Sequence, residues 1–98
     1  MPDGEVTARL LRIHGRVQGV WYRASAQAEA VRLGLRGWVR NRMDGTVEAL
    51  VIGHRTGIDA FVAWAHQGPP KAQVTRIDVS DADRSAAADD SFEQWPTA

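Results

Sequence analysis

The chain has 98 residues, 44% of them hydrophobic, and its 12 basic and 12 acidic side chains sum to zero formal charge. This length suits one domain around one hydrophobic core, so we expect a single domain over residues 1–98. The lack of cysteine excludes disulfide bonds, thiolate metal sites and cysteine nucleophiles. No apolar run approaches the roughly 18 residues of a membrane span, and the first residues lack the apolar segment of a signal peptide, which predicts a soluble cytoplasmic protein.

The charges are unevenly distributed along the chain. Between Arg9 and Arg42 lie eight arginines and a single acidic residue, Glu29, whereas six acidic residues between Asp78 and Glu93 accompany one arginine. A basic first half favours an anionic partner, although a solvated arginine-rich face explains it equally well.

A strand and a helix are predicted in the first third of the chain. Residues 7–14 place Leu11 and Ile13 on one face, which is typical of a strand. Apolar residues then recur at helical spacing over residues 22–33, and Gly34 stands where a C-cap glycine belongs. We therefore expect an amphipathic helix that ends before this glycine.

A β-hairpin is predicted over residues 35–53. Two alternating segments flank an Asp44-Gly45 turn signal, so the strands on either side should pair. In the first of them Trp38 shares its face with two arginines, opposite the face expected to join the core.

A second helix should follow the hairpin. Thr56, with Asp59 three positions later, is similar to a capping box and predicts the helix start. Apolar residues repeat at helical spacing until Gly68-Pro69-Pro70 ends the helix.

Two more strands complete the expected elements. Residues 72–80 alternate except at Val74, which suggests a bulge in this strand. Residues 91–95 are expected to add a short edge strand that buries Phe92. The order strand, helix, strand, strand, helix, strand predicts an α+β fold, the ferredoxin-like sandwich (βαββαβ), with an antiparallel sheet and two helices on one face. This fold hosts enzymes, RNA-binding modules and ligand sensors, so it does not fix the function.

The connection "GRVQGVWYR", residues 15–23, lies where a strand ends and a helix begins. Unpaired backbone N–H groups and the positive end of the helix dipole meet there, which favours anion binding. Glycines 15 and 19 permit positive φ angles, so the amides of residues 16–22 can curl around one phosphate-sized group, and Arg23 can add a bidentate clamp. A tight turn followed by a solvated arginine is the alternative interpretation.

Common phosphate-loop chemistries do not fit this segment. It has no GK[ST] and its glycine spacing is not GxGxxG, while a cysteine phosphatase loop needs a thiolate. His14, at the end of the preceding strand, is expected to be hydrogen-bonded. Ser25 lacks a recognisable base partner and is expected to hydrogen-bond locally. The loop is therefore expected to hold an anion without supplying a nucleophile.

Two motifs together resemble the acylphosphatase family. "GRVQGVWYR" is similar to the family's first signature, and "GWVRNRMDGTVEALVIG", residues 37–53, is similar to its second. The resemblance extends to "GPPKAQV" at residues 68–74 and so covers nearly the whole chain. It implies the ferredoxin-like sandwich and hydrolysis of the carboxyl-phosphate bond of acyl phosphates.

The resemblance also implies site residues. Arg23 matches the family's phosphate-binding arginine and Asn41 the asparagine that orients the attacking water, so these two are the expected catalytic residues. Trp21 departs from the small residue or phenylalanine expected there, at a position that bears on acyl-group preference and access. The expected phosphate-binding residues are Arg16, Val17, Gln18, Gly19, Val20, Trp21, Tyr22 and Arg23.

The implied reaction needs little machinery. The leaving carboxylate has a conjugate acid with a pKa of about 4, so no general acid is required. No cluster of carboxylates or histidines has metal-ligand spacing, and we expect neither a metal nor another cofactor. The expected partners are a small acyl phosphate and inorganic phosphate, bound by a monomer that contacts neither nucleic acid nor membrane.

Two other functions remain open at this stage. Arg36, Trp38 and Arg40 share a strand face that could bind nucleic acid, as RRM sheets of this topology do, although no RRM-like aromatic motif is present. Alternatively the loop and Arg23 could form a phosphate or acyl phosphate sensor without turnover.

Overall fold

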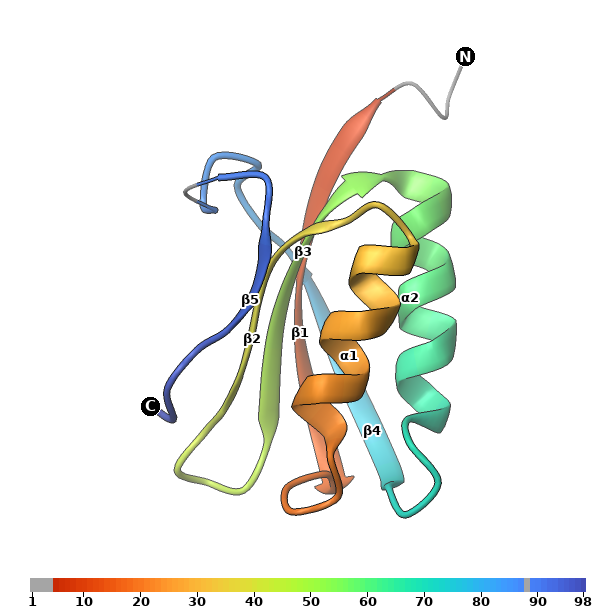
Figure 1. The fold of residues 1–98 in the computed structure, drawn as a ribbon, viewed down its shortest axis with the longest axis vertical. Coiled ribbons are helices and arrows are strands. Elements are labelled where there is room, and N and C mark those ends of the chain that lie inside the picture. The colour runs from red at the N-terminus through yellow and green to blue at the C-terminus, as the bar shows by residue number, and fades with distance from the viewer. Residues whose placement is uncertain (1–4, 88) are drawn as a thin grey trace.

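The computed structural model describes residues 5–87 and 89–98. Its five strands form one sheet in the order β4-β1-β3-β2-β5, and both helices cover the same face of that sheet (Figure 1). This is the expected α+β ferredoxin-like arrangement. None of the helices in the described residues has the length and hydropathy needed to cross a membrane. The elements are β1 (Val6–Arg16), α1 (Tyr22–Arg32), β2 (Arg36–Asn41), β3 (Val47–His54), α2 (Arg55–Gln67), β4 (Gln73–Asp81) and β5 (Phe92–Gln94).

The core lies between the helices and the sheet. Ala26 and Ala30 of α1 and Phe61 of α2 are fully buried there, as the helical spacing predicted. Small side chains on α1 let this helix approach the sheet closely, while β-branched residues suit the strand positions beneath it. Strand residues in this cluster are Leu11, Ile13, Val39, Val47, Ala49 and Val51.

The structure agrees with the expectation at one edge of the sheet and differs from it at the other. β1 continues to Arg16, and its register against β4 shifts between the pairs His14↔Arg76 and Gly15↔Val74. This shift is the bulge that the irregular position of Val74 predicted. β5 buries Phe92 as expected but runs parallel to β2, which makes the sheet mixed.

The start of α2 corrects the capping prediction. The helix begins at Arg55, its N-cap is His54 in extended conformation, and no side chain caps it. β3 ends at His54 and leads directly into α2. Thr56 therefore already lies within the first helical turn and cannot act as the N-cap residue.

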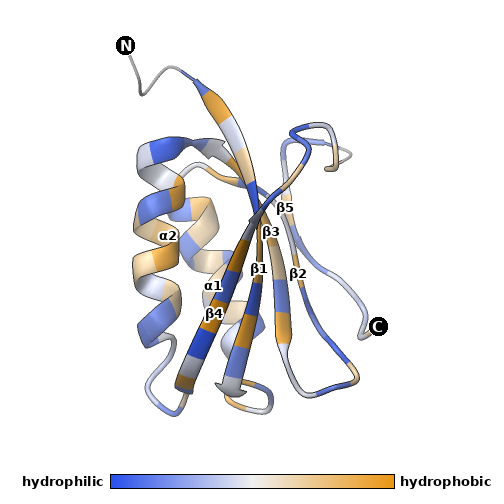
Figure 2. Cartoon of the chain, turned by 180° about the vertical axis from the view of Figure 1, so that it is seen from behind, coloured by the Kyte–Doolittle hydropathy of each residue, from blue (hydrophilic) through white to orange (hydrophobic). Residues whose placement is uncertain are grey.

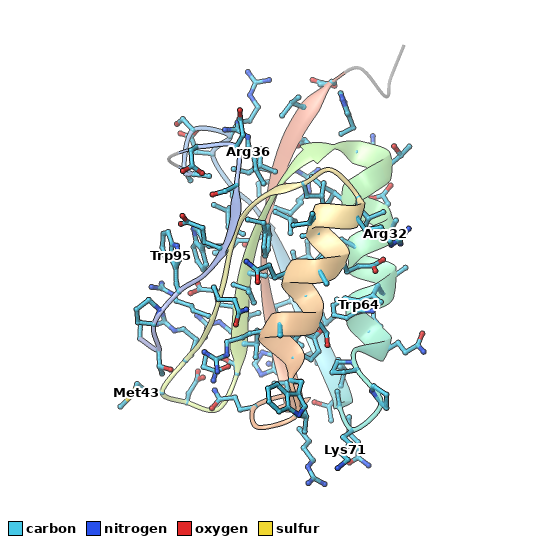
Figure 3. The ribbon with its side chains drawn as sticks, viewed as in Figure 1. Arg32, Arg36, Met43, Trp64, Lys71 and Trp95 are labelled. Carbon is cyan, nitrogen blue, oxygen red and sulfur yellow. The ribbon has the colours of Figure 1, made fainter. Side chains whose placement is uncertain are left out.

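The sheet face away from the helices carries a second apolar cluster. Trp38 is only 8% exposed because Trp95 stacks on it, with ring centroids 4.5 Å apart and planes 14° from parallel. Ala82 and Ala87 pack against the same cluster and, with Trp95, cover part of this face. Trp95 is labelled beside β5 in Figure 3, and Figure 2 shows β1 and β4 from this side with hydrophilic and hydrophobic residues alternating.

Glu48 forms an ion-pair cluster on the same face. Its side chain accepts from Arg40 Nε at 2.8 Å and Arg42 Nη1 at 3.3 Å, and Arg12 Nη2 lies 3.6 Å away. Arg12 and Arg40 stand directly opposite Glu48 on the two neighbouring strands. Part of the basic first half of the chain is thus neutralised within the fold, and Glu48 itself is only 6% exposed.

Candidate active site

The predicted phosphate loop joins β1 to α1 and lies at the same end of the sheet as the turn between β2 and β3 (Figure 1). Because β1 runs to Arg16, the loop proper spans residues 17–21. Gly19 has φ 73° and Trp21 has φ 67°, so the chain turns twice through left-handed backbone before α1 begins. The predicted positive φ of Gly19 is present, whereas nothing in the sequence predicted one at a tryptophan.

Backbone N–H groups remain open along this loop. Within residues 5–87 and 89–98, none of the N–H groups of residues 17–24 donates to a protein acceptor, and the first that does is Ser25 N, 3.1 Å from Trp21 O. Trp21 occupies the N-cap position and its side chain makes no capping hydrogen bond. The open amides and the positive end of α1 therefore coincide, which suits a bound anion.

Two arginines add positive charge at the loop. In the described part of the chain, neither Arg16 nor Arg23 forms an ion pair, in contrast to the arginines around Glu48. Arg23 lies in the first turn of α1 and is partly exposed. Its guanidinium is free to make the bidentate contact that planar oxyanions accept from arginine.

Gln18 ties the loop to the neighbouring turn. Its Nε2 donates to the backbone oxygens of Arg42 and Thr46, both at 2.8 Å. The turn itself is held by Asp44 Oδ1, which accepts from Thr46 N at 3.0 Å and from Thr46 Oγ1 at 2.6 Å. These bonds from Thr46 lower the pKa of the Asp44 carboxyl. The loop and the turn thus form one hydrogen-bonded unit.

Asn41 ends β2, immediately before this turn. Its Cα pairs with that of Val47, and its side-chain Oδ1 is buried without a hydrogen-bond partner in the described part of the chain. A buried acceptor without a partner costs about 1–3 kcal/mol, so it is rare in a folded protein outside a site. Since Gln18 bonds to the next residue, Arg42, the unpartnered oxygen belongs to the same end of the molecule as the open amides.

A cleft of about 430 Å³ opens beside the loop. It contains Arg23 and several loop residues, and Gln94 of β5 also lines it, whereas Asn41 does not. The structure therefore gathers the loop and Arg23 around one cleft, and it brings Asn41 to the loop from the side of the turn. The lining residues are Val17, Gly19, Trp21, Tyr22, Arg23, Ala24 and Gln94.

Two other polar side chains near the loop are already occupied. The Tyr22 hydroxyl donates to Ala65 O at 2.6 Å inside the core, and burial raises its pKa well above the usual value. His14 Nε2 lies 3.0 Å from Asp78 Oδ2, which confirms that this histidine is hydrogen-bonded and lowers the pKa of the Asp78 carboxyl. Among residues 5–87 and 89–98, no group of three or more histidines, aspartates or glutamates is placed to hold a metal ion.

Comparison of the sequence with known proteins identifies its family. The acylphosphatase family model matches residues 9–94. The chain belongs to the acylphosphatase family. An acylphosphatase from Azoarcus sp. (strain BH72) is 67% identical over 81 residues, which cover 83% of each chain. The hydrolysis of acyl phosphates is the activity of this family, so the chain is an enzyme that hydrolyses them.

Solved acylphosphatases share the fold. The acylphosphatase from Coxiella burnetii superposes with a TM-score of 0.86 at 32% identity and covers 94% of this chain and 95% of that one. The acylphosphatase from Bacillus subtilis gives 0.83 at 37% identity, over 93% and 99% of the two chains. The expected family and the ferredoxin-like fold of an acylphosphatase are thereby confirmed.

One feature of this acylphosphatase site was missed by sequence reasoning. Gln18 was expected to contribute only its backbone amide, yet its side chain makes the bridge between loop and turn. Its partners are carbonyl groups 24 and 28 residues away, which leave no signal in residue spacing. The roles expected for Arg23 and Asn41 stay predictions.

Proposed function

We propose that the chain hydrolyses the carboxyl-phosphate bond with its phosphate held by the amides of residues 16–22 and the Arg23 guanidinium, and with the attacking water oriented by Asn41. The observation that carries this assignment is the buried, unpartnered Oδ1 of Asn41 at the end of the molecule where open amides and Arg23 meet. Gln18 supports it, because its hydrogen bonds hold the turn after Asn41 against the loop.

The chemical step follows from these groups. A water oxygen forms a bond to phosphorus as the bond from phosphorus to the acyl oxygen breaks, and the electron pair of that bond leaves with the carboxylate. Charge on the phosphoryl oxygens is met by N–H donors and by Arg23, and positioning and electrostatics supply the acceleration. The leaving carboxylate needs no proton, since its conjugate acid has a pKa of about 4.

Asn41 is neutral and acts by position. Its Oδ1 accepts one hydrogen bond from the water, which fixes the direction of attack, but an amide takes no proton. The water's proton therefore passes to an oxygen of the phosphoryl group itself. An acyl phosphate dianion and water thus give one carboxylate and one dihydrogen phosphate, so atoms and charge balance.

The finer assignments belong to the same proposal. We infer that the enzyme works without a metal or other cofactor, as a monomeric single domain over residues 1–98 in the cytoplasm. Its partners are then a small acyl phosphate and inorganic phosphate, with no nucleic acid or membrane. The stacking of Trp95 on Trp38 argues against the nucleic-acid alternative, because it covers the aromatic surface that a base would use.

Hydrolysis of benzoyl phosphate in excess chelator tests the proposal. We expect turnover by the parent protein, and a fall of kcat by about two orders of magnitude or more in Asn41→Ala, the usual loss for one transition-state contact. Gln67→Ala, which removes an exposed amide at the end of α2, is the matched control and should keep the parental rate.

Three results would each contradict a part of the proposal. A near-normal kcat in Asn41→Ala would remove the water-orienting role. A folded parent protein that binds inorganic phosphate but cleaves benzoyl phosphate no faster than water does would support a sensor in place of the enzyme. Activity abolished by chelator and restored by a divalent cation would overturn the metal-free mechanism.

A further inference from the structure

Trp21 stands out at the rim of the cleft. Its side chain is 80% exposed, and in the described part of the chain its indole makes no hydrogen bond and stacks on no other ring. A large aromatic side chain gains stability from burial, so one left in water contributes little to the fold. Nothing that Trp21 contacts within the protein explains why this position carries an indole.

The backbone of Trp21 makes the position more unusual. Its φ of 67° lies in the left-handed region, and Trp21 is the only residue other than glycine with positive φ in the part of the chain that is described. Left-handed backbone is unfavourable for a residue with a Cβ, and such conformations gather at ligand sites. Trp21 holds this conformation at the N-cap of α1, where an extended backbone is usual, and the conformation sets the direction in which the indole leaves the chain.

The cleft offers more space than a phosphate group needs. The phosphate would occupy the amides and Arg23, and the remaining lining includes Trp21, Ala24 and Gln94. A volume of about 430 Å³ falls within the range of pockets that hold small organic ligands. An acyl phosphate bound through its phosphate must place its acyl group in this remaining part, beside an exposed indole.

We propose that Trp21 is a specificity-determining residue, whose indole packs against the acyl group and favours substrates with a flat aromatic or other large apolar acyl part. The inference rests on the proposed function and deepens it, since it concerns the half of the substrate that Arg23 and the amides do not hold. Trp21 acts on the leaving part of the substrate by contact alone and takes no part in proton transfer.

The test compares two substrates, benzoyl phosphate and acetyl phosphate, in the parent protein and in Trp21→Ala. Alanine keeps the Cβ, so the left-handed backbone is equally unfavourable and only the ring is lost. We expect kcat/KM for benzoyl phosphate to fall about two- to tenfold, the factor that an aromatic contact is worth, while the value for acetyl phosphate changes less. Trp21→Phe should recover most of the preference, and competitive inhibition by inorganic phosphate should stay at the parental level in both variants.

Other outcomes overturn the inference. An equal loss for both substrates, or weaker inhibition by inorganic phosphate in Trp21→Ala, would mean that the residue shapes the loop instead of the acyl site. Parental kcat/KM values for both substrates in Trp21→Ala would mean that the indole touches no acyl group. If the parent protein hydrolyses both substrates, either of these results rejects only the inference; if it hydrolyses neither, the proposed function fails and the inference fails with it.

Discussion

Tyr22 shows how one residue serves the site and the core at once. Its backbone N–H is one of the open amides at the start of α1. Its ring is buried, with the centroid 5.6 Å from that of Trp64, and its hydroxyl donates a hydrogen bond to Ala65 O. The helix end that faces the cleft is thereby anchored to α2. Trp64, labelled on α2 in Figure 3, is the aromatic partner in this contact.

The buried tyrosine makes stability fall at alkaline pH. Burial raises the pKa of Tyr22 in the folded state above its unfolded value of about 10, so unfolding releases a proton once the pH exceeds that value. The contribution is fully present below pH 10 and is lost as the pH rises toward the folded pKa. In Tyr22→Phe we expect the free energy of unfolding to drop by about 1 kcal/mol at neutral pH and to decline less between pH 10 and 11.5. Urea unfolding of the parent protein and of Tyr22→Phe at pH 7, 10 and 11.5 measures these free energies. An identical decline between pH 10 and 11.5 in the two proteins would contradict the prediction.

Arg23 should lose function even when its charge is kept. Lysine cannot present two parallel donors, so Arg23→Lys should recover only part of what Arg23→Ala loses. We expect Arg23→Ala to raise KM and to lower kcat/KM for benzoyl phosphate by about 100-fold or more. Arg32→Ala, an exposed arginine on the same helix that pairs with Glu29, is the matched control. Steady-state kinetics decide the point, and equal effects at positions 23 and 32 would reject the clamp.

Residue roles were predictable only in part. The glycine pattern and the adjacent strand and helix indicated an anion site, and the family motifs indicated Arg23 and Asn41. The unpartnered Oδ1 of Asn41 and the two bonds of the Gln18 side chain depend on which chain segments meet in space. Residue spacing carries no information about such long-range contacts, so neither feature was predicted.

At the scale of elements, the pairing of β1 with β4 determines where the loop begins. Gly15 lies within this pairing with φ 119°, and a Cβ there would stand 2.1 Å from Gln73 O. The backbone of β4 approaches so closely that no side chain fits. The glycine therefore fixes the end of β1, and through it the position of the amides that follow.

Gly15→Ala should consequently lower the free energy of unfolding more than a glycine substitution that causes only backbone strain. Gly34→Ala is the comparison, because Gly34 has φ 73° and a Cβ there would meet nothing within 4 Å. We expect a loss of about 1–2 kcal/mol for Gly34→Ala and a clearly larger loss for Gly15→Ala. Thermal or urea unfolding of both variants measures the difference, and equal losses would mean that β4 shifts to make room.

Most elements were predictable because each carries its own periodicity. β1, the hairpin and both helices follow apolar spacing, and the irregular position of Val74 indicated the bulge. The predicted start of α2 was wrong by two residues, because β3 leads directly into the helix and the cap-like pair Thr56 and Asp59 lies inside it. The parallel direction of β5 was not predictable, since a strand of three residues carries no directional signal.

At the scale of the whole molecule, the sheet has apolar clusters on both faces. Ala82, Ala87 and Trp95 cover part of the face away from the helices, and Trp95 stacks there on Trp38. Arg40 lies 4.8 Å above the centroid of the Trp38 ring and links this cluster to the ion pairs of Glu48. The alternation of β2 placed Trp38 on this face but carried no information about what covers it.

Removing the Trp95 ring should destabilise the fold and expose Trp38 to water. We expect Trp95→Ala to reduce the free energy of unfolding by about 2–4 kcal/mol and to move tryptophan emission to longer wavelength. Gln94 lines the cleft from the helix side, where its Nε2 donates to Gln27 Oε1, whereas the Trp95 ring packs on the opposite face of the sheet, so KM for benzoyl phosphate should stay close to the parental value. Parental stability in Trp95→Ala would show that the end of the chain around β5 is held by other contacts.

The Glu48 cluster has a consequence for mutational tolerance. The Glu48 carboxylate forms ion pairs with three arginines, so replacing any one of them leaves Glu48 with two cationic neighbours. Replacing the acid leaves three partly buried guanidinium groups to repel one another, with the Asp44 carboxylate still beside Arg12. We therefore expect related sequences to tolerate the loss of any one of the arginines at positions 12, 40 and 42. A neutral residue at position 48 should occur only in sequences that also lack at least one of those arginines.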